Sequence, residues 1–214
     1  MSISSTPTMT SKVVAGAGDM LDLVVRAWAA ATGEPVMGVE IPQRADYAFD
    51  TSPLDAHDPA TTVLFAAFDE RFGNFKRAEL MRDAMARGFQ LATIAAPGAI
   101  VAPDAKVGPN VFIGSGVVVG SGSVVEFNSV VHAGAVIDHG VRIKASCWID
   151  TGVTIGRRAE IGAHCILRMG VAVAPAVKIG RLCDIGVPGL YRTDVAAKTV
   201  YDPRYEEPLI VYGG

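Results

Sequence analysis

The sequence predicts a mainly β protein in which a parallel β-helix of about five coils follows a small α/β domain. Three observations support this fold class. Aliphatic residues recur every six positions through the second half of the chain, and the first half lacks that period. Glycine is frequent, at 23 residues, and aromatic residues make up only 7%, which suits a narrow interior with little room for rings.

The composition is that of an ordinary globular protein. Half of the 214 residues are hydrophobic and 19% are charged, with a net charge of −3. No basic cluster indicates a nucleic-acid surface, and no apolar run approaches the ~18 residues of a membrane span. Residues 1–11 are rich in Ser and Thr and lack the pattern of a signal peptide, so we expect a flexible tail on a cytoplasmic protein.

Residues 12–95 alternate between strand-like and helix-like segments and predict a small parallel sheet with covering helices. The expected strands are 12–18, 35–41, 62–67 and 89–94, and the expected helices are 20–31 and 74–87. Asp19 is placed to cap the first helix, and Gly88 to close the second. Residues 42–61 have no clear pattern.

Residues 96–195 follow a six-residue period that predicts the β-helix, and residues 196–214 form a C-terminal extension. Three hexads would make one coil of eighteen residues, with residues eighteen apart stacked about 4.8 Å from each other. The fifteen aliphatic positions are Val101, Val107, Ile113, Val119, Val125, Val131, Ile137, Ile143, Ile149, Ile155, Ile161, Leu167, Val173, Ile179 and Ile185.

The eighteen-residue spacing can be checked within the sequence. The three cysteines, Cys147, Cys165 and Cys183, are eighteen residues apart and all occupy the small inward position of their hexads. They are open to two interpretations, a metal or redox site and a stack of buried small residues, and the second is favoured. Glu126 and Lys144 have the same spacing, so their opposite charges should lie on neighbouring coils.

The motifs resemble those of the left-handed β-helix acyltransferases with hexapeptide repeats, and in particular the sugar acetyltransferases of the sialic-acid and bacillosamine type. The resemblance is carried by Gly16-Ala-Gly18, by residues 89–103 at the junction with the first coil, by residues 132–139, and by residues 192–195. It implies a Rossmann-like small domain, left-handed coils, a homotrimer, acetyl-CoA as co-substrate and no metal ion.

His139 is the catalytic residue that this resemblance implies. It lies in the seventh hexad, where the family has its general base, and an imidazole with an ordinary pKa of about 6.5 suits that role. The family usually has an acidic residue directly after this histidine, but here the next residue is Gly140. Asp138 is therefore the candidate residue that orients the imidazole. His132 and His164 are weaker candidates for the catalytic histidine. The alternative interpretation is a surface histidine without a role.

The resemblance also implies binding residues for both substrates. Coenzyme contacts fall on Trp148, which stands where the family has a second histidine, and on Met169 and Val187. The nucleotide of a nucleotide-linked sugar would be held by the small domain. The residues implied for that site are Gly16, Ala17, Gly18, Phe68 and Asp69, with Phe68 replacing a glycine of the family.

We therefore predict an acetyltransferase that moves an acetyl group from acetyl-CoA to an amino group of a nucleotide-linked sugar. Two alternatives remain open. One keeps the fold and the chemistry but transfers the acetyl group to a sugar hydroxyl or to a non-sugar amine. The other is a non-catalytic trimeric scaffold with a decayed site.

Overall fold

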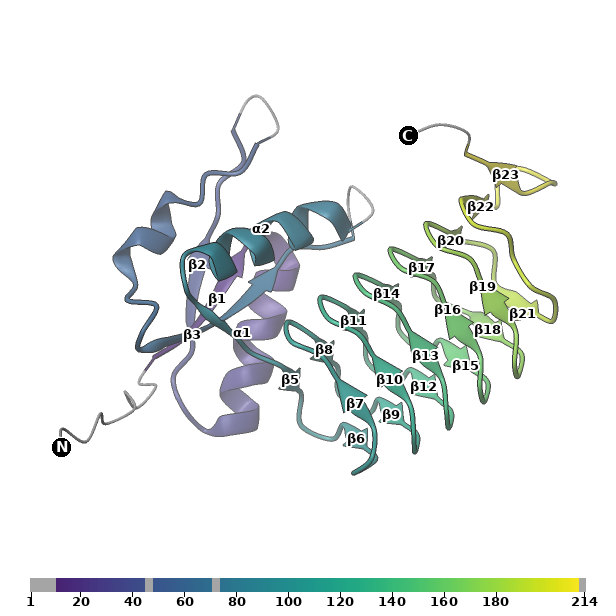
Figure 1. Ribbon diagram of the computed structural model, residues 1–214, viewed down its shortest axis with the longest axis horizontal. Helices are drawn as coiled ribbons and strands as arrows, with labels where there is room; N and C mark the ends of the chain where they lie inside the picture. The colour runs from purple at the N-terminus through teal and green to yellow at the C-terminus, as the bar shows by residue number, and fades with distance from the viewer. Residues whose placement is uncertain (1–10, 45–47, 71–73, 212–214) are drawn as a thin grey trace, which may run out of the picture.

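The computed structural model describes residues 11–44, 48–70 and 74–211, which form a small α/β domain set against one side of a parallel β-helix (Figure 1). The expected tail therefore lies almost entirely outside the described residues. Among the residues described, no helix is long and apolar enough to cross a membrane.

The small domain is a four-stranded parallel sheet with one helix on each face. The strands lie in the order β2-β1-β3-β4, and both faces of the central strands are buried, as parallel sheets require. α1 packs with one face and α2 with the other. The elements are β1 (Ser11–Gly16), α1 (Gly18–Thr32), β2 (Met37–Glu40), the 3₁₀-helix η1 (Ser52–Ala56), β3 (Thr62–Ala67), α2 (Phe75–Ala86) and β4 (Gln90–Leu91).

Two details of the small domain differ from expectation. α1 begins at Gly18, and Ala17 occupies the cap position without a side-chain hydrogen bond, so Asp19 lies in the first turn instead of capping the helix. The strand expected at 89–94 is divided between the two domains. β4 pairs with β3 of the small sheet, whereas Ile94 already donates its backbone N–H to Val111 in the β-helix.

The β-helix has three sheets, which we name by what their outer surfaces carry. The docking face contains β5 (Ile94–Ala95), β8 (Phe112–Ile113), β11 (Val130–Val131), β14 (Trp148–Ile149), β17 (Ile166–Leu167), β20 (Asp184–Ile185), β22 (Thr199–Tyr201) and β23 (Leu209–Ile210). The apolar face contains β6 (Ile100–Val101), β9 (Val118–Val119), β12 (Val136–Ile137), β15 (Thr154–Ile155), β18 (Val171–Val173) and β21 (Gly189–Tyr191). The charged face contains β7 (Lys106–Val107), β10 (Val124–Val125), β13 (Arg142–Ile143), β16 (Glu160–Ile161) and β19 (Lys178–Ile179).

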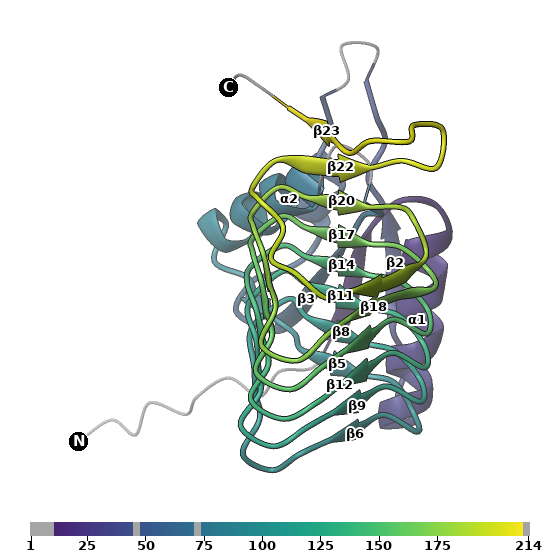
Figure 2. The ribbon, with the colours of Figure 1, turned by 90° about the vertical axis from the view of Figure 1, so that its right-hand side faces the viewer.

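The solenoid has about six turns, where the sequence predicts about five. The difference arises at both ends. β5 opens a coil before Val101, and β21 and β22 continue the winding past Ile185. Figure 2 shows the docking-face strands stacked in one column from β5 to β22. Since β22 pairs with β20, the C-terminal extension begins inside the solenoid, and only β23 runs antiparallel.

The interior confirms the eighteen-residue spacing. The two-residue strands from β5 to β20 turn their first residue outward and their second inward, and the inward aliphatic residues form one continuous core. The three cysteines are buried in this core and are not bonded to one another. The side-chain contact with Cys147, together with burial, raises the pKa of Cys165, so this thiol stays protonated, which supports the interpretation as packing.

The small domain covers the docking face. Outward residues of five successive coils pack with α1 and β3 in one apolar cluster, and they are Ile94, Phe112, Val130, Trp148 and Ile166. Arg77 of α2 is fully buried at this boundary and donates to the backbone carbonyl of Asn128 at 2.8 Å. Burial lowers the pKa of Arg77 to about 10, which leaves the guanidinium charged at neutral pH.

Candidate functional site

Three columns of corner residues join the faces of the β-helix, and most of these residues have positive φ. The first corner, between the docking and apolar faces, has glycines at 98, 116, 134, 152 and 170. The second corner, between the apolar and charged faces, has Gly122, Gly140, Arg158 and Ala176. The third corner, between the charged and docking faces, has Asn110, Asn128, Ser146, His164 and Leu182. His139 lies at the second corner, between β12 and β13.

His139 is exposed, and its imidazole contacts the carboxylate of Asp138. Nδ1 of His139 lies 3.1 Å from Oδ1 of Asp138, which also accepts the backbone N–H of His139 at 2.7 Å. The other carboxylate oxygen accepts the backbone N–H of Arg157 on the next coil. The backbone N–H of His139 lowers the pKa of Asp138 and the imidazole contact adds to this, so Asp138 is ionised. The contact between the predicted base and its candidate orienting residue is therefore present.

The ionised carboxylate determines which nitrogen of His139 is basic. A carboxylate can only accept hydrogen bonds, so Nδ1 must carry the proton in the contact with Asp138. The lone pair of neutral His139 is then on Nε2, at the outer end of an exposed ring. This arrangement suits removal of a proton from a group that approaches from outside the chain.

Glycines explain how the chain makes this corner. A Cβ on Gly120, one coil earlier, would lie 2.8 Å from the backbone N of His139, so only glycine lets the coils stack here. Gly140 has φ of +66°, a conformation that glycine adopts without strain. An acidic residue at position 140, as in the family, would therefore adopt a strained backbone, and here the carboxylate that contacts the imidazole belongs to Asp138.

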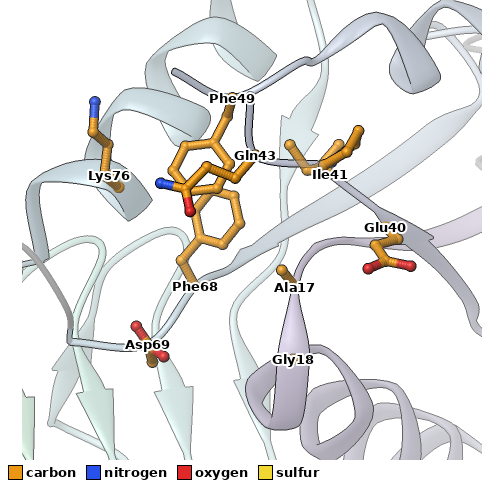
Figure 3. A pocket seen from close by; sticks show the side chains of 10 residues that line it. Ala17, Gly18, Glu40, Ile41, Gln43, Phe49, Phe68, Asp69 and Lys76 are labelled. Carbon is orange, nitrogen blue, oxygen red and sulfur yellow. The ribbon is translucent and has the colours of Figure 1, made fainter. Parts of the chain in front are cut away.

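A pocket of about 250 Å³ lies in the small domain where its parallel strands end (Figure 3). Open α/β sheets bind ligands outside the carboxyl ends of their strands. Four of the five residues that the sequence implies for substrate binding line this pocket, and they are Ala17, Gly18, Phe68 and Asp69. That they bind a substrate stays a prediction.

Gly16, the fifth of these residues, has a packing role. A Cβ on Gly16 would lie 1.9 Å from the carbonyl oxygen of Ala67, so this position must be glycine for β1 to lie beside β3. Its own carbonyl accepts the backbone N–H of Ile41, which lines the pocket.

Other lining residues were missed by the sequence reasoning. They are Glu40, Gln43, Phe49 and Lys76, with Ile41 and Pro42. Figure 3 shows the rings of Phe49 and Phe68 together on one wall, with Glu40 and Asp69 on opposite sides. A signal for Glu40 did exist, because an acidic residue about twenty positions after the glycine turn is typical of nucleotide-binding sheets. Phe49 and Gln43 lie in a segment without periodicity.

The three residues predicted to contact the coenzyme have different surroundings. Trp148 is buried at the domain boundary, where its indole N–H donates to Asp150 at 2.6 Å and the guanidinium of Arg77 lies 5.5 Å from its ring. Met169 is exposed beside a hollow of about 440 Å³ at the end of the docking face. The carbonyl of Val187 accepts the hydroxyl of Tyr191. Coenzyme binding by these residues stays a prediction.

The two weaker histidine candidates lie at the domain boundary. The ring of His132 packs on Trp148 at 4.4 Å, and burial lowers its pKa against the opposing effects of Asp150 and Glu70. His164 stacks on Phe75 at the start of α2. Within the described parts of the chain, no three His, Cys, Asp or Glu side chains are grouped to hold a metal ion.

The pocket and His139 lie on different sides of the β-helix. The small domain contacts the docking face and, through Arg77, the corner at Asn128, and α1 lines one hollow together with Ser115 at the other bounding corner. His139 lies at the remaining corner, between the other two faces. One chain therefore presents the pocket and the imidazole to different surroundings.

Comparison with known proteins gives the same architecture. The family model described as the GMPPB C-terminal domain matches residues 89–179, which span the β-helix from its junction with the small domain to β19. No curated protein matches the chain in sequence. A similar solved structure is a histidine-to-alanine variant of GDP-perosamine N-acetyl transferase from Caulobacter crescentus in complex with CoA and GDP-perosamine. It is 25% identical, with a TM-score of 0.78, over 92% of this chain and 95% of that one.

A second similar structure is the acetyltransferase domain of PglB from Neisseria gonorrhoeae. It is 21% identical, with a TM-score of 0.80, and covers 94% of this chain and 100% of that one. At that identity the likeness concerns the fold. Both similarities extend over the small domain and the solenoid together.

Proposed function

We infer that this chain is an acyltransferase, because it combines the solenoid and the small α/β domain of the hexapeptide-repeat sugar N-acetyltransferases. We propose that it transfers an acetyl group from acetyl-CoA to the amino group of a nucleotide-linked sugar in the cytoplasm. The proposal rests chiefly on two features that occur in the same chain. One is an exposed imidazole oriented by Asp138, and the other is a pocket at the carboxyl ends of a parallel sheet.

His139 acts as the general base in this proposal. The neutral amine of the sugar attacks the thioester carbonyl, and Nε2 takes the proton that the nitrogen loses as the N–C bond forms. The C–S bond then breaks, and the proton on the imidazole passes to the departing thiolate, which leaves as the thiol of CoA. Asp138 stabilises the imidazolium that exists between these two transfers.

The pocket supplies the groups that a nucleotide needs. α1 begins at the pocket without a side-chain cap, so its first backbone N–H groups and the positive end of the helix favour a phosphate. Glu40 ends β2 and is placed to accept hydroxyls of a ribose. Phe49 and Phe68 offer an apolar wall, and Gln43 offers an amide that can both donate and accept.

A homotrimer would bring the imidazole of one chain near the pocket of another. The apolar face supports such an assembly, because its outward residues include Ile100, Val136 and Leu190, which are 64%, 40% and 52% exposed in the single chain. No residue with an ionisable side chain occupies the outward position of a strand on this face, whereas the charged face carries Lys106 and Arg142 in such positions. The apolar face is therefore the surface that another copy would cover.

The deciding experiment measures thiol release from acetyl-CoA with GDP-linked and UDP-linked amino sugars, and the product is identified by mass. We expect turnover only when the sugar carries a free amine. Matched controls are the same nucleotide-linked sugars with a hydroxyl in place of the amine, and the free amino sugars. Turnover with the hydroxyl sugar alone would replace the proposal by O-acetylation, and acetylation of free amino sugars at the same rate would remove the nucleotide from it.

A further inference from the structure

The residues directly after β3 contact both the pocket of the small domain and the β-helix. Phe68 and Asp69 line the pocket of the small domain, and Glu70, the next residue, extends to the β-helix. Oε1 of Glu70 accepts a hydrogen bond from Nη1 of Arg168 at 2.7 Å, across 98 residues of sequence. This ion pair thus joins a pocket-lining loop to the fifth strand of the docking face, since Arg168 directly follows β17.

Arg168 is fixed from its other side. Nε and Nη2 donate to the two carboxylate oxygens of Asp184 at 3.2 and 3.1 Å. Asp184 begins β20, which is the strand next to β17, so the pair follows from the register of the coils. A guanidinium held in this forked geometry has lost most of its freedom before it meets Glu70.

The charges of this group are secure at neutral pH. Burial opposes ionisation of Glu70, but the hydrogen bond and the charge of Arg168, together with a backbone hydrogen bond and the effect of His132, outweigh it and lower the pKa of Glu70. Burial likewise opposes the charge of Arg168, and the hydrogen bonds to Asp184 and Glu70 raise its pKa instead. The pair is therefore ionised on both sides.

A second arginine holds the start of the same loop. Nη1 of Arg77 donates to the carbonyl of Phe68 at 3.0 Å, and Nη2 donates to the carbonyl of Asn128 in the β-helix. Residues 68–70 are thus tied to the solenoid at both ends. Arg77 is fully buried and its loss would disturb folding, whereas Arg168 is partly exposed and open to substitution.

We propose that Arg168 is a positioning residue that acts through Glu70 to fix the pocket-lining loop, and with it the acceptor, relative to the β-helix. The proposal rests on the proposed acetyl transfer to a nucleotide-linked sugar. The apolar cluster between the small domain and the docking face stabilises the contact between the two domains, and a partly exposed ion pair adds little to that stability. The consequence of the pair is geometric, because small displacements of a bound reactant lower the rate of transfer.

The test compares Arg168→Gln, Glu70→Gln and the double variant. Each is expected to lower kcat/KM for the acceptor roughly tenfold, with the KM for acetyl-CoA and the melting temperature unchanged. The double variant should lose no more than either single variant, because both remove the same contact. The matched control is Lys144→Gln, which removes the ion pair with Glu126 between two coils, without involving the small domain, and should leave kcat/KM unchanged.

Hydrogen exchange of the backbone amides of residues 66–70 gives a readout that does not depend on the reaction. Both single variants should exchange faster there than the wild type and the Lys144→Gln control. If the wild type acetylates no nucleotide-linked sugar, the proposed function fails, and this exchange still decides whether the pair fixes the loop. Unchanged exchange, additive losses in the double variant, or an equal rise in the KM for acetyl-CoA would overturn the proposal.

Discussion

The backbone of His139 is held by hydrogen bonds on both sides, while its exposed ring contacts the carboxylate of Asp138. Its carbonyl accepts the N–H of Arg158 from the next coil, and its own N–H is held by the carboxylate of Asp138. Ser123 of the previous coil donates to the carbonyl of Asp138 at 2.7 Å. The corner is therefore rigid while the imidazole stays open to a reactant, which is the combination that a general base requires.

Replacing His139 with alanine should remove the base and leave the binding surfaces intact. We expect turnover to fall by roughly 10²–10⁴, with both Michaelis constants close to unchanged. Asp138→Asn should cause a smaller loss of turnover. The amide oxygen can still accept a hydrogen bond from the imidazole, but the charge that stabilises the imidazolium is lost. Steady-state kinetics with both substrates measure these effects. Full activity of His139→Ala would place the base elsewhere, and His132 would be the next residue to test.

The contact between Asp138 and His139 shows where residue-level prediction ends. Neighbouring residues of a strand point to opposite faces, so the sequence left Asp138 as no more than a candidate. The hexad turn removes that restriction, because the chain changes direction at Gly140, whose φ is positive. The contact depends on corner geometry, which the six-residue period does not specify.

At the scale of elements, the third corner joins the two domains through a ladder of side chains. The amide of Asn110 pairs with both backbone groups of Ala66 in β3, at 2.7 and 3.2 Å. Asn110 donates to Asn128, which donates in turn to Ser146, each at 2.9 Å and each one coil further on. The side chain of Asn110 thus extends the small sheet into the solenoid.

Asn128 is the middle of this ladder, and its replacement should be costly. Asn128→Ala leaves the buried polar partners of Asn128 unpaired. It also places alanine, whose side chain cannot form a hydrogen bond, in a left-handed backbone conformation with φ of +58°. We expect it to lower the free energy of unfolding by about 2–4 kcal/mol. Asn128→Gly loses the same hydrogen bonds but tolerates the backbone, so it should be less destabilising than alanine. Denaturant unfolding measures both, and equal losses would show that the backbone conformation contributes nothing.

The elements differ in how far the sequence predicted them. β3 was predicted residue for residue, because the short apolar run between Thr62 and Asp69 is typical of a buried strand. The first coil was missed because its inward residue is Ala95, which lies exposed at the open end of the solenoid and breaks the aliphatic series. Four of the ten lining residues of the pocket were predicted, since Gly18 and Phe68 follow strands, whereas Phe49 reaches the pocket from a segment without a period.

At the scale of the whole molecule, three faces of one solenoid have different surroundings. The docking face is covered by the chain's own small domain, and the charged face places Glu160 in register between Arg142 and Lys178. Among the described residues, the outward strand positions of the apolar face carry no charge, and no other element packs over them. This asymmetry is why the proposed assembly involves one face and leaves the small domain in place.

A charge on the apolar face should therefore prevent assembly. Val136→Glu places a carboxylate at the centre of the surface proposed to be buried, and we expect monomers where the wild type forms trimers. The matched control is Val124→Glu on the charged face, where Lys106 and Arg142 flank the position and would accept the new charge. Light scattering at micromolar concentration measures both. A monomeric wild type would contradict the trimer, and trimers of Val136→Glu would assign another face.

The stacking of residues eighteen apart also decides which changes in length this chain tolerates during evolution. Loss of one residue within a coil shifts every later aliphatic side chain by one place and turns it outward. Loss or duplication of eighteen residues restores every pairing. Descendants of such a chain should therefore differ in length by whole coils, gained or lost beyond β17, where the small domain no longer covers the solenoid.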